Sequence, residues 1–505
     1  MAQSIGLNSP NSYRLISAVI SNNEGNQIDV SNLVDSFQLT ESIYQMFLTG
    51  NIVIADNINV FNRLNITGQE YLRLHFSGIQ GNEEEVPDDE QINQVFRIFN
   101  VSTYVRDTST DLSKVLYSLD FCSPLLYEAR TKRISRVYRG KSGDILNKIC
   151  KEELNFVETE GGRGGAAGDL KPRVKGGQEV GNYFSIFNAD KGDVSGFLCP
   201  NWTVYKTLEW LRDNTSEDDS QPYGDSYYFF QTALNGFRFM NVEQMYNISY
   251  LDGAVEFSPR DGSMVNSDNY DYSEGVGNDI LSYNKVNLYD TLLAHQSGLY
   301  AGTVHSYDTV TKTITVIPSQ FTQQFEIENN EYKKGLAVAP SFRFGAENIR
   351  VPDDGGGEDV MGAAQTAIEG DSIIDRFGAA VNFGYNVPYT FSNKAEDVGN
   401  SITSGGSHVK FNRQRVESLF ESNRVNIQIP ARTNISAGMV IQVKIPMPTP
   451  APSDREELQH NGRLLVESIT WKGSRSGLEV QLSCTTDGHQ VNPDTFEGMT
   501  LDSQY

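Results

Sequence analysis

The sequence has few cysteines and no long apolar run. Its four cysteines, Cys122, Cys150, Cys199 and Cys484, are scattered over 505 residues, and no CxxC or Cys/His spacing is present. This pattern argues against a disulfide framework and a zinc site, and favours reduced thiols in a chain made in a cytoplasm. No segment reaches the ~18–20 apolar residues of a membrane span, and residues 1–10 show no signal-peptide pattern.

Basic residues are also scarce. The chain has 41 Lys and Arg against 65 Asp and Glu, so its formal net charge is −24. This balance argues against non-specific nucleic-acid binding, because the phosphate contribution to such binding needs a basic surface. Solubility is the ordinary explanation of such acidity, and an acidic assembly that must not retain DNA is the alternative.

The motifs that carry enzyme chemistry are incomplete. Ser135–Ser142 resembles a phosphate-binding loop, but its first glycine is replaced by Ser135 and no apolar parallel strand precedes it, so a capped helix start is the better interpretation. Asp268, Asp271 and Glu274 fall short of a calcium loop. The six histidines show no metal-binding spacing; they are His75, His295, His305, His408, His460 and His489. We therefore predict no catalytic, cofactor-binding or metal-binding residue, and no cofactor.

Strand patterns dominate what is present. Asn51–Ala55 is rich in β-branched residues and ends at Asp56 and Asn57, and Tyr71–Phe76 alternates apolar with polar residues. The same pattern predicts strands at 95–101, 115–121, 313–316, 425–429, 439–445, 464–471 and 478–484, and a hairpin at 227–240. Helices are expected at about 145–154, from Pro200–Asn201 to Asp213, and at 413–422, with a helix or extended crossover at 279–295. A half-buried antiparallel sheet that closes into a small barrel is the expected fold.

Several stretches resemble the central hub proteins of contractile-tailed bacteriophage baseplates, whose barrels are related to those of type VI secretion spike proteins. They are LTGNIVIADNINVFNRLNITGQEYLRLHF (48–76), EARTKRISRVYRGKSGDILNKICKEEL (128–154), WTVYKTLEWLRDN (202–214) with SYYFFQTALNGFRFMNVEQM (226–245), and LYDTLLAHQSGLYAGTVHSYDTVTKTITVI (288–317). The resemblance covers about 13–155, 198–245, 283–330 and 410–487, in the family's order.

The resemblance implies a mainly β protein with α+β parts: two small antiparallel, tail-tube-like β-barrels, an α/β middle domain and loop insertions. The expected divisions are an N-terminal barrel at 1–128, a second domain at 129–245 with a Gly-rich loop at 156–190, a connector at 246–285, a second barrel split into 286–345 and 411–487, an insertion at 346–410, and a polar tail at 488–505.

The implied function is structural and non-enzymatic. Three copies would form a baseplate hub that joins a hexameric tail tube to a trimeric central spike, with a channel through which DNA passes without specific binding. Further expected partners are the tape measure and peripheral baseplate or wedge proteins. The expected location is the virion tail after assembly in the host cytoplasm, without membrane insertion. Two alternatives stay open, a cell-wall or polysaccharide hydrolase of the tail and a β-rich receptor-binding tail protein. Individual interface residues are not predicted.

Overall fold

The computed structural model describes twenty segments of the chain: 11–78, 91–106, 115–140, 142–159, 169–172, 187–188, 197–215, 226–234, 236–242, 244–245, 255–259, 279–286, 301–308, 314–320, 380–386, 413–414, 416–418, 420–421, 424–443 and 462–486. Strands dominate them, which confirms the mainly β class. The acidic loop at 83–90, the calcium-like segment at 268–274, most of the Gly-rich loop and of the 346–410 insertion, and the tail lie outside the described residues.

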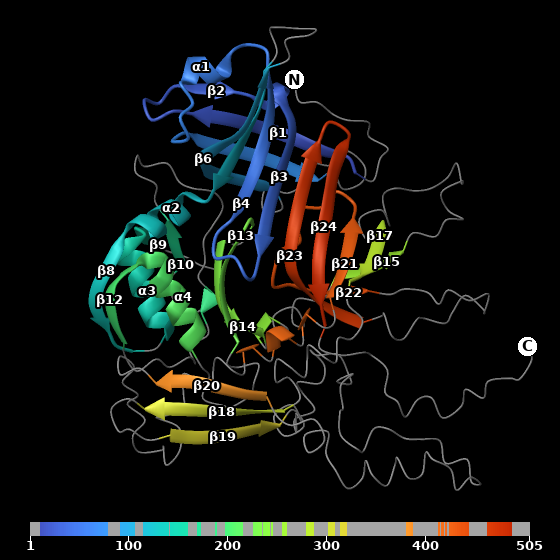
Figure 1. The fold of residues 1–505 in the computed structure, drawn as a ribbon. Helices are drawn as coiled ribbons and strands as arrows, with labels where there is room; N and C mark the ends of the chain where they lie inside the picture. The colour runs from blue at the N-terminus through green and yellow to red at the C-terminus, as the bar shows by residue number, and fades with distance from the viewer. Residues whose placement is uncertain are drawn as a thin grey trace, which may run out of the picture.

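The N-terminal β unit is an antiparallel sheet in the order β3-β4-β7-β6-β5-β1-β2 (Figure 1). Its elements are β1 (Tyr13–Ser21), β2 (Gln27–Asp29), η1 (Ser31–Leu33), β3 (Val34–Ser42), β4 (Thr49–Asp56), α1 (Val60–Leu64), β5 (Tyr71–Gly78), β6 (Ile92–Arg106) and β7 (Val115–Cys122). The expected alternation in β5 is confirmed, since Leu72, Leu74 and Phe76 are fully buried while Arg73 is exposed.

The middle unit combines helices with short strands. Its elements are α2 (Pro124–Thr131), β8 (Arg133–Tyr138), α3 (Ser142–Glu153), β9 (Phe156–Thr159), β10 (Asp169–Pro172), β11 (Phe187–Asn188), β12 (Phe197–Thr203), α4 (Val204–Asn214), β13 (Tyr227–Thr232) and β14 (Gly236–Asn241). The helices share an apolar core with β8, β12 and the β13–β14 hairpin. Helix α2 was not expected.

Helix α4 begins later than the sequence pattern indicated. The expected start at Pro200–Asn201 is wrong, because these residues belong to β12, where Asn201 adopts a left-handed φ of 55° at an irregularity in the pairing with β8. The Thr203 hydroxyl instead accepts a hydrogen bond of 3.2 Å from the Lys206 amide and caps the helix.

The second β unit collects strands from distant parts of the sequence. It contains β15 (Val255–Pro259), β16 (Asp279–Ile280), β17 (Ser282–Lys285), β21 (Arg424–Ile429), β22 (Val440–Val443), β23 (Gly462–Ser474) and β24 (Gly477–Thr485). The segment expected as a connector thus contributes three strands, of which β15 pairs with β22 and β17 pairs with β21. A separate sheet contains β18 (Ala301–Asp308), β19 (Ile314–Gln320) and β20 (Ala380–Asn386) (Figure 1).

Two closed barrels were expected, but no closed barrel is found among the described residues. Their strands instead form one 14-stranded sheet that runs through both β units. The physical reason is the pairing of edges: β3, the edge of the N-terminal β unit, bonds to β23 of the second β unit. One apolar cluster accordingly includes Phe37, Leu39, Trp471 and Val480 from both units.

Candidate functional site: a buried junction between three parts of the chain

The two β units meet along one antiparallel strand pair, which we call the β3–β23 seam. Its register runs from Ser468 opposite Ser42 to Ser474 opposite Ser36. Strand β23 keeps β24 on one edge, while its other edge pairs with β22 up to Leu465 and with β3 from Ser468. One strand is therefore shared by both units (Figure 1).

Glu467 lies where β23 changes neighbours. The pairing with β24 shifts register between Val466 and Ser468, which is a bulge-type irregularity. The Glu467 carbonyl accepts a hydrogen bond of 2.9 Å from the Ile43 amide. The bulge therefore places Glu467 against the chain that follows β3.

The buried side chain of Glu467 joins the two units a second time. Its carboxylate accepts a 2.6 Å hydrogen bond from the Tyr44 hydroxyl and a 2.9 Å charged bond from Arg424 Nε. Burial raises the pKa of Glu467, while the Tyr44 bond and the Arg424 charge oppose this rise. Such a group is stabilising only while its partners stay in place, because an unpaired buried charge is costly.

Glu41 bridges three parts of the chain from within β3. One carboxylate oxygen accepts a 2.7 Å bond from the Ala233 amide, and the other accepts a 2.6 Å bond from the Ala437 amide. Ala233 belongs to the turn between β13 and β14, and Ala437 precedes β22. Burial raises the pKa of Glu41 to about 8, although the two amides and the Arg238 charge lower it.

The β13–β14 turn is fixed to the N-terminal β unit by further bonds. The Gln94 side chain of β6 donates to the Ala233 carbonyl at 2.7 Å, and the Leu48 amide donates to the Gln231 side chain at 3.3 Å. Ala233 thus has both its amide and its carbonyl bonded to the N-terminal β unit. This turn docks the middle unit onto the sheet.

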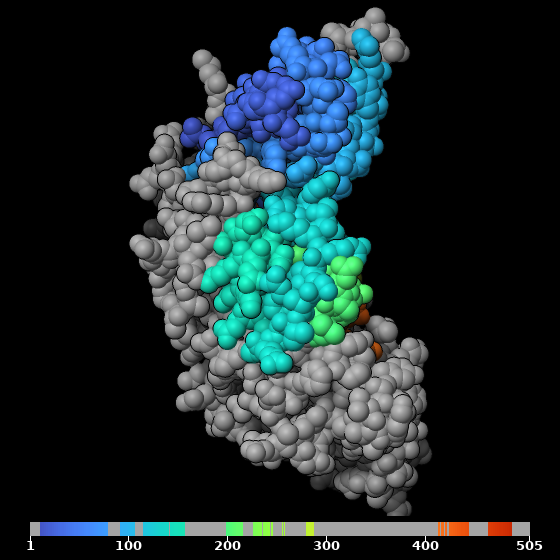
Figure 2. All heavy atoms as spheres, turned by 90° about the vertical axis from the view of Figure 1, so that its left-hand side faces the viewer, coloured from blue at the N-terminus to red at the C-terminus, as the bar shows by residue number. Residues whose placement is uncertain are grey.

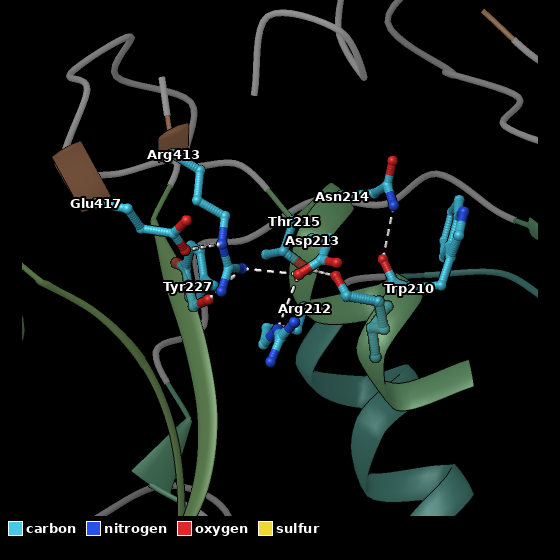
Figure 3. Close-up of polar contacts among 9 residues, drawn as sticks. Trp210, Arg212, Asp213, Asn214, Thr215, Tyr227, Arg413 and Glu417 are labelled. Carbon is cyan, nitrogen blue, oxygen red and sulfur yellow. Dashed lines mark hydrogen bonds and ion pairs between the residues drawn. The ribbon is translucent and has the colours of Figure 1, made fainter. Parts of the chain in front are cut away.

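Arg413 connects the described segment at 413–421 to helix α4 and strand β13 (Figure 3). Its guanidinium donates to the Tyr227 carbonyl and to Asp213 at 2.9 Å each, and pairs with Glu417 at 2.9 Å. Asp213 also bonds Arg212 at 2.8 Å. Burial lowers the pKa of Arg413, but interactions with Tyr228, Asp213 and Glu417 outweigh it and leave the pKa raised.

The C-terminal end of helix α4 favours nearby positive charges. The side chains of Asn214 and Thr215 donate to the carbonyls of Trp210 and Leu211 at 2.7 and 2.6 Å, so two of the last helical carbonyls are satisfied (Figure 3). The positive charges of Arg212 and Arg413 lie beside this end, where the helix dipole is negative.

Tyrosine rings connect the Arg413 contacts to the seam. The Arg413 guanidinium lies 4.8 Å from the Tyr228 ring centre, and the Tyr228 ring meets the Tyr44 ring edge-on at 5.8 Å. Tyr44 in turn bonds Glu467. A continuous set of contacts therefore runs from the middle unit through the N-terminal β unit to the second β unit, and we call it the junction network.

The junction network is held together by strand pairing, hydrogen bonds, ion pairs and ring contacts. Among the described residues, no group of three or more His, Cys, Asp and Glu side chains could hold a metal ion. The loop-like stretch at 135–142 joins β8 to the start of α3, and His75 bonds Gln91 at 2.7 Å. The described part of the chain also contains no helix long and apolar enough to cross a membrane.

Sequence reasoning missed Glu41 and Glu467, although a signal was available. Phe37, Leu39 and Glu41 share one face of β3, so the carboxylate falls in an apolar row. Glu467 directly follows the buried run Leu464–Val466 in β23. A lone charge in phase with buried residues is the pattern that predicts a paired buried carboxylate.

Comparison with known proteins shows similarity in structure but not in sequence. No protein-family model matches the chain, and no curated protein matches it. Solved structures of phage tail and type VI secretion proteins do resemble it. A tail protein from Neisseria meningitidis matches at 9% identity and a TM-score of 0.44, over 94% of this chain and 96% of its own.

Two further structures resemble the chain in the same way. The tail protein of prophage MuSo2 from Shewanella oneidensis matches at 9% identity and a TM-score of 0.44, over 93% of this chain and 98% of its own. An E. coli type VI secretion component, described as similar to the bacteriophage T4 tail proteins gp27 and gp5, matches at 8% identity and a TM-score of 0.37, over 90% of this chain and 73% of its own.

Proposed function

We propose that this chain is a structural, non-enzymatic baseplate protein that acts as the central hub of a contractile tail. Three copies form a ring that joins a hexameric tail tube to a trimeric spike and leaves a channel for DNA. The β3–β23 seam is the observation that carries this proposal. It makes one chain supply two β units side by side in one continuous sheet.

Symmetry matching between the chain and its partners supports this function. A ring of three chains that each contribute two β units offers six sheet positions, so it can contact a six-fold partner on one side and a three-fold partner on the other. The contacts between units of neighbouring copies would then repeat the kind of edge pairing found in the seam, by strand addition. The resemblance of residues 48–76 and 128–154 to hub proteins supports the same function.

Net charge supports the proposed channel. At −24 per copy the assembled ring is strongly acidic, and an acidic wall repels the phosphate backbone. The protein should therefore not retain double-stranded DNA on a filter, even at low salt. Retention that disappears as salt is raised would contradict a non-adhesive channel.

Mass determination and imaging test the proposal. Purified protein should have the mass of three chains by light scattering, and single-particle images should show a ring with six sheet lobes. In intact tails, quantitative mass spectrometry should find about three copies against many copies of the tube protein. A copy number equal to that of a tube or sheath subunit, or clearing of cell-wall material in a zymogram, would overturn the hub function.

A further inference from the structure

One segment of this acidic chain is basic. Residues 124–154 contain eight Lys and Arg against four Asp and Glu, whereas the whole chain has a net charge of −24. The segment spans α2, β8 and α3, which lie on the face of the middle unit turned toward the viewer in Figure 2. A basic face on a protein that otherwise repels anions indicates a contact with an acidic partner.

The centre of this face is the two-stranded ribbon of β8 and β12. Its inner side packs into the middle-unit core through Ile134, Tyr138 and Cys199. On its outer side Val137 and Leu198 stand directly opposite each other and are 53% and 45% exposed. In the part of the chain that the structure describes, the two strands pair only with each other, so each keeps an unused backbone edge.

Arginines flank the apolar pair on the same ribbon. Arg133 and Arg139 are both exposed, and Arg133 donates a 3.1 Å bond to the Asn201 carbonyl. Arg136 differs from them because it is engaged by Glu152 and Glu153 of α3. The outer face therefore combines two exposed cations with exposed apolar area. This combination favours contact with an acidic protein surface over exposure to water.

The same chain carries a matching acidic surface. Residues 15–62 contain no Lys or Arg, the longest such stretch in the sequence, and three of their acidic residues are exposed: Glu24, Asp29 and Asp35. Glu24 lies in the turn between β1 and β2, Asp29 ends β2, and both are exposed. This surface belongs to the N-terminal β unit, on a different part of the molecule from the β8–β12 ribbon (Figure 1).

Copies that each carry −24 repel one another, so a ring of them needs local attraction that exceeds this repulsion. We propose that the β8–β12 ribbon of one copy binds the Glu24–Asp29 turn of the next copy. The contact is heterologous, because a basic face meets a different, acidic face, and contacts of this kind form rings when the rotation between copies closes. This inference rests on the proposed ring of three copies and assigns one of its contacts.

A second copy is favoured over nucleic acid as the occupant. The exposed Val137–Leu198 pair and the strand edges of the described ribbon offer apolar area and backbone hydrogen bonds, which a polypeptide matches and a phosphate backbone does not. The acidity of the remaining chain also repels a long polyanion.

Charge reversal on both faces tests the contact. Arg139→Glu alone and Arg133→Glu with Arg139→Glu should raise the concentration for half-assembly at least about tenfold, measured by light scattering and mass photometry. Glu24→Lys with Asp29→Asn should do the same; the asparagine introduced by the second change retains a side-chain oxygen that can accept the 2.9 Å bond from the Ser31 amide. A chain with all four changes restores opposite charges across the contact and should assemble nearly as well as the natural chain.

Controls separate this inference from the hub function. Arg14→Glu with Arg475→Glu makes the same charge change on exposed residues away from the Glu24–Asp29 turn and should leave assembly unchanged. Raising salt from about 0.05 to about 0.5 M should narrow the difference in assembly between the natural chain and the charge-reversal variants, because salt screens the charges of the contact.

Three results would overturn the assigned contact while leaving the hub function intact. In the first, Arg139→Glu and the double variant form trimers at the same half-assembly concentration as the natural chain. In the others, the four-change chain folds but stays dissociated, or the natural chain binds DNA and Arg139→Glu abolishes that binding. A natural chain that never forms trimers would instead overturn the hub function itself.

Discussion

The β3–β23 seam and the Arg413 contacts both join parts of the chain that are far apart in sequence, but they do so by different means. The seam combines a strand pairing with two buried carboxylates, Glu41 and Glu467, whose exposed fractions are 1% each. Arg413 instead works through ion pairs with Asp213 and Glu417, of which Glu417 is 41% exposed. We expect burial, more than the number of contacts, to decide how much each joint contributes to stability.

Removing the Glu41 carboxylate should have the largest effect. Glu41→Ala leaves the Ala233 and Ala437 amides buried without their acceptor, which we expect to cost about 4 kcal/mol of unfolding free energy. Glu41→Gln should cost about half as much, because its amide nitrogen cannot accept. Chemical unfolding measures both, and Glu479→Ala on the exposed face of β24 is the control, with an effect below about 0.5 kcal/mol. An Ala variant as stable as the control would contradict the role of Glu41.

The pH dependence of stability should also come from Glu41. Its pKa is about 8 in the folded chain against an ordinary value of 4.5, so the folded state holds this proton more tightly than the unfolded state. This contribution is fully present below about pH 4.5 and is lost as pH rises through about 8, with a slope of up to about 1.4 kcal/mol per pH unit. Thermal midpoints of the natural chain and Glu41→Gln should converge as pH rises across this window. Parallel curves would show that Glu41 does not titrate there.

Overpacking the seam should have an intermediate effect. A Cβ at Gly473 would lie 2.1 Å from Phe37 Cε1, so Gly473→Ala forces the two strands apart. We expect a loss of about 2–3 kcal/mol, measured by chemical unfolding. Phe37→Leu removes the clashing ring atoms, and the double variant should be more stable than the sum of the two single changes predicts. If the losses of unfolding free energy of the two single variants simply added in the double variant, the contact between Gly473 and Phe37 would not determine how closely the strands pack.

The smallest effect should come from Arg413. Arg413→Lys keeps the charge but loses the fork that reaches Tyr227, Asp213 and Glu417, which we expect to cost about 1–2 kcal/mol. Hydrogen exchange of the β13 amides should increase while that of β23 stays unchanged. The matched control is Arg475→Lys, because Arg475 pairs with Asp35 at 3.5 Å on the surface and should contribute little. If the β13 amides exchanged equally fast in Arg413→Lys and in Arg475→Lys, the Arg413 contacts would not stabilise this joint.

Local structure could largely be predicted from the sequence, and long-range pairing could not. The alternation in β5, β7 and β24 and the apolar spacing of α4 predict these elements, because each pattern is complete within a few residues. The partner of β3 is more than 400 residues away, and no local pattern specifies it. Closed barrels are the prediction for each unit taken by itself, because closure pairs the edge strands. In the folded chain the edge strand of one unit pairs with a strand of the other unit instead.

The candidate site was harder to predict because its residues lack the spacing of any motif. Glu41 and Glu467 come from strands whose neighbours became apparent only in the folded chain. The partners of Arg413 lie far from it in the sequence: Asp213 precedes it by 200 residues and Tyr227 by 186. The phase of Glu41 with Phe37 and Leu39 was the one local sign available.

The sharing of β23 has a mechanical consequence. Because β23 is paired with β24 on one edge and with β3 on the other, a pull along the strand direction loads the seam in shear. All bonds between β3 and β23 then resist together, whereas a pull across the strands would open them one after another. In the hub proposed above, strands oriented along the axial thrust of the tail would carry that thrust from one half of each chain to the other without a hinge.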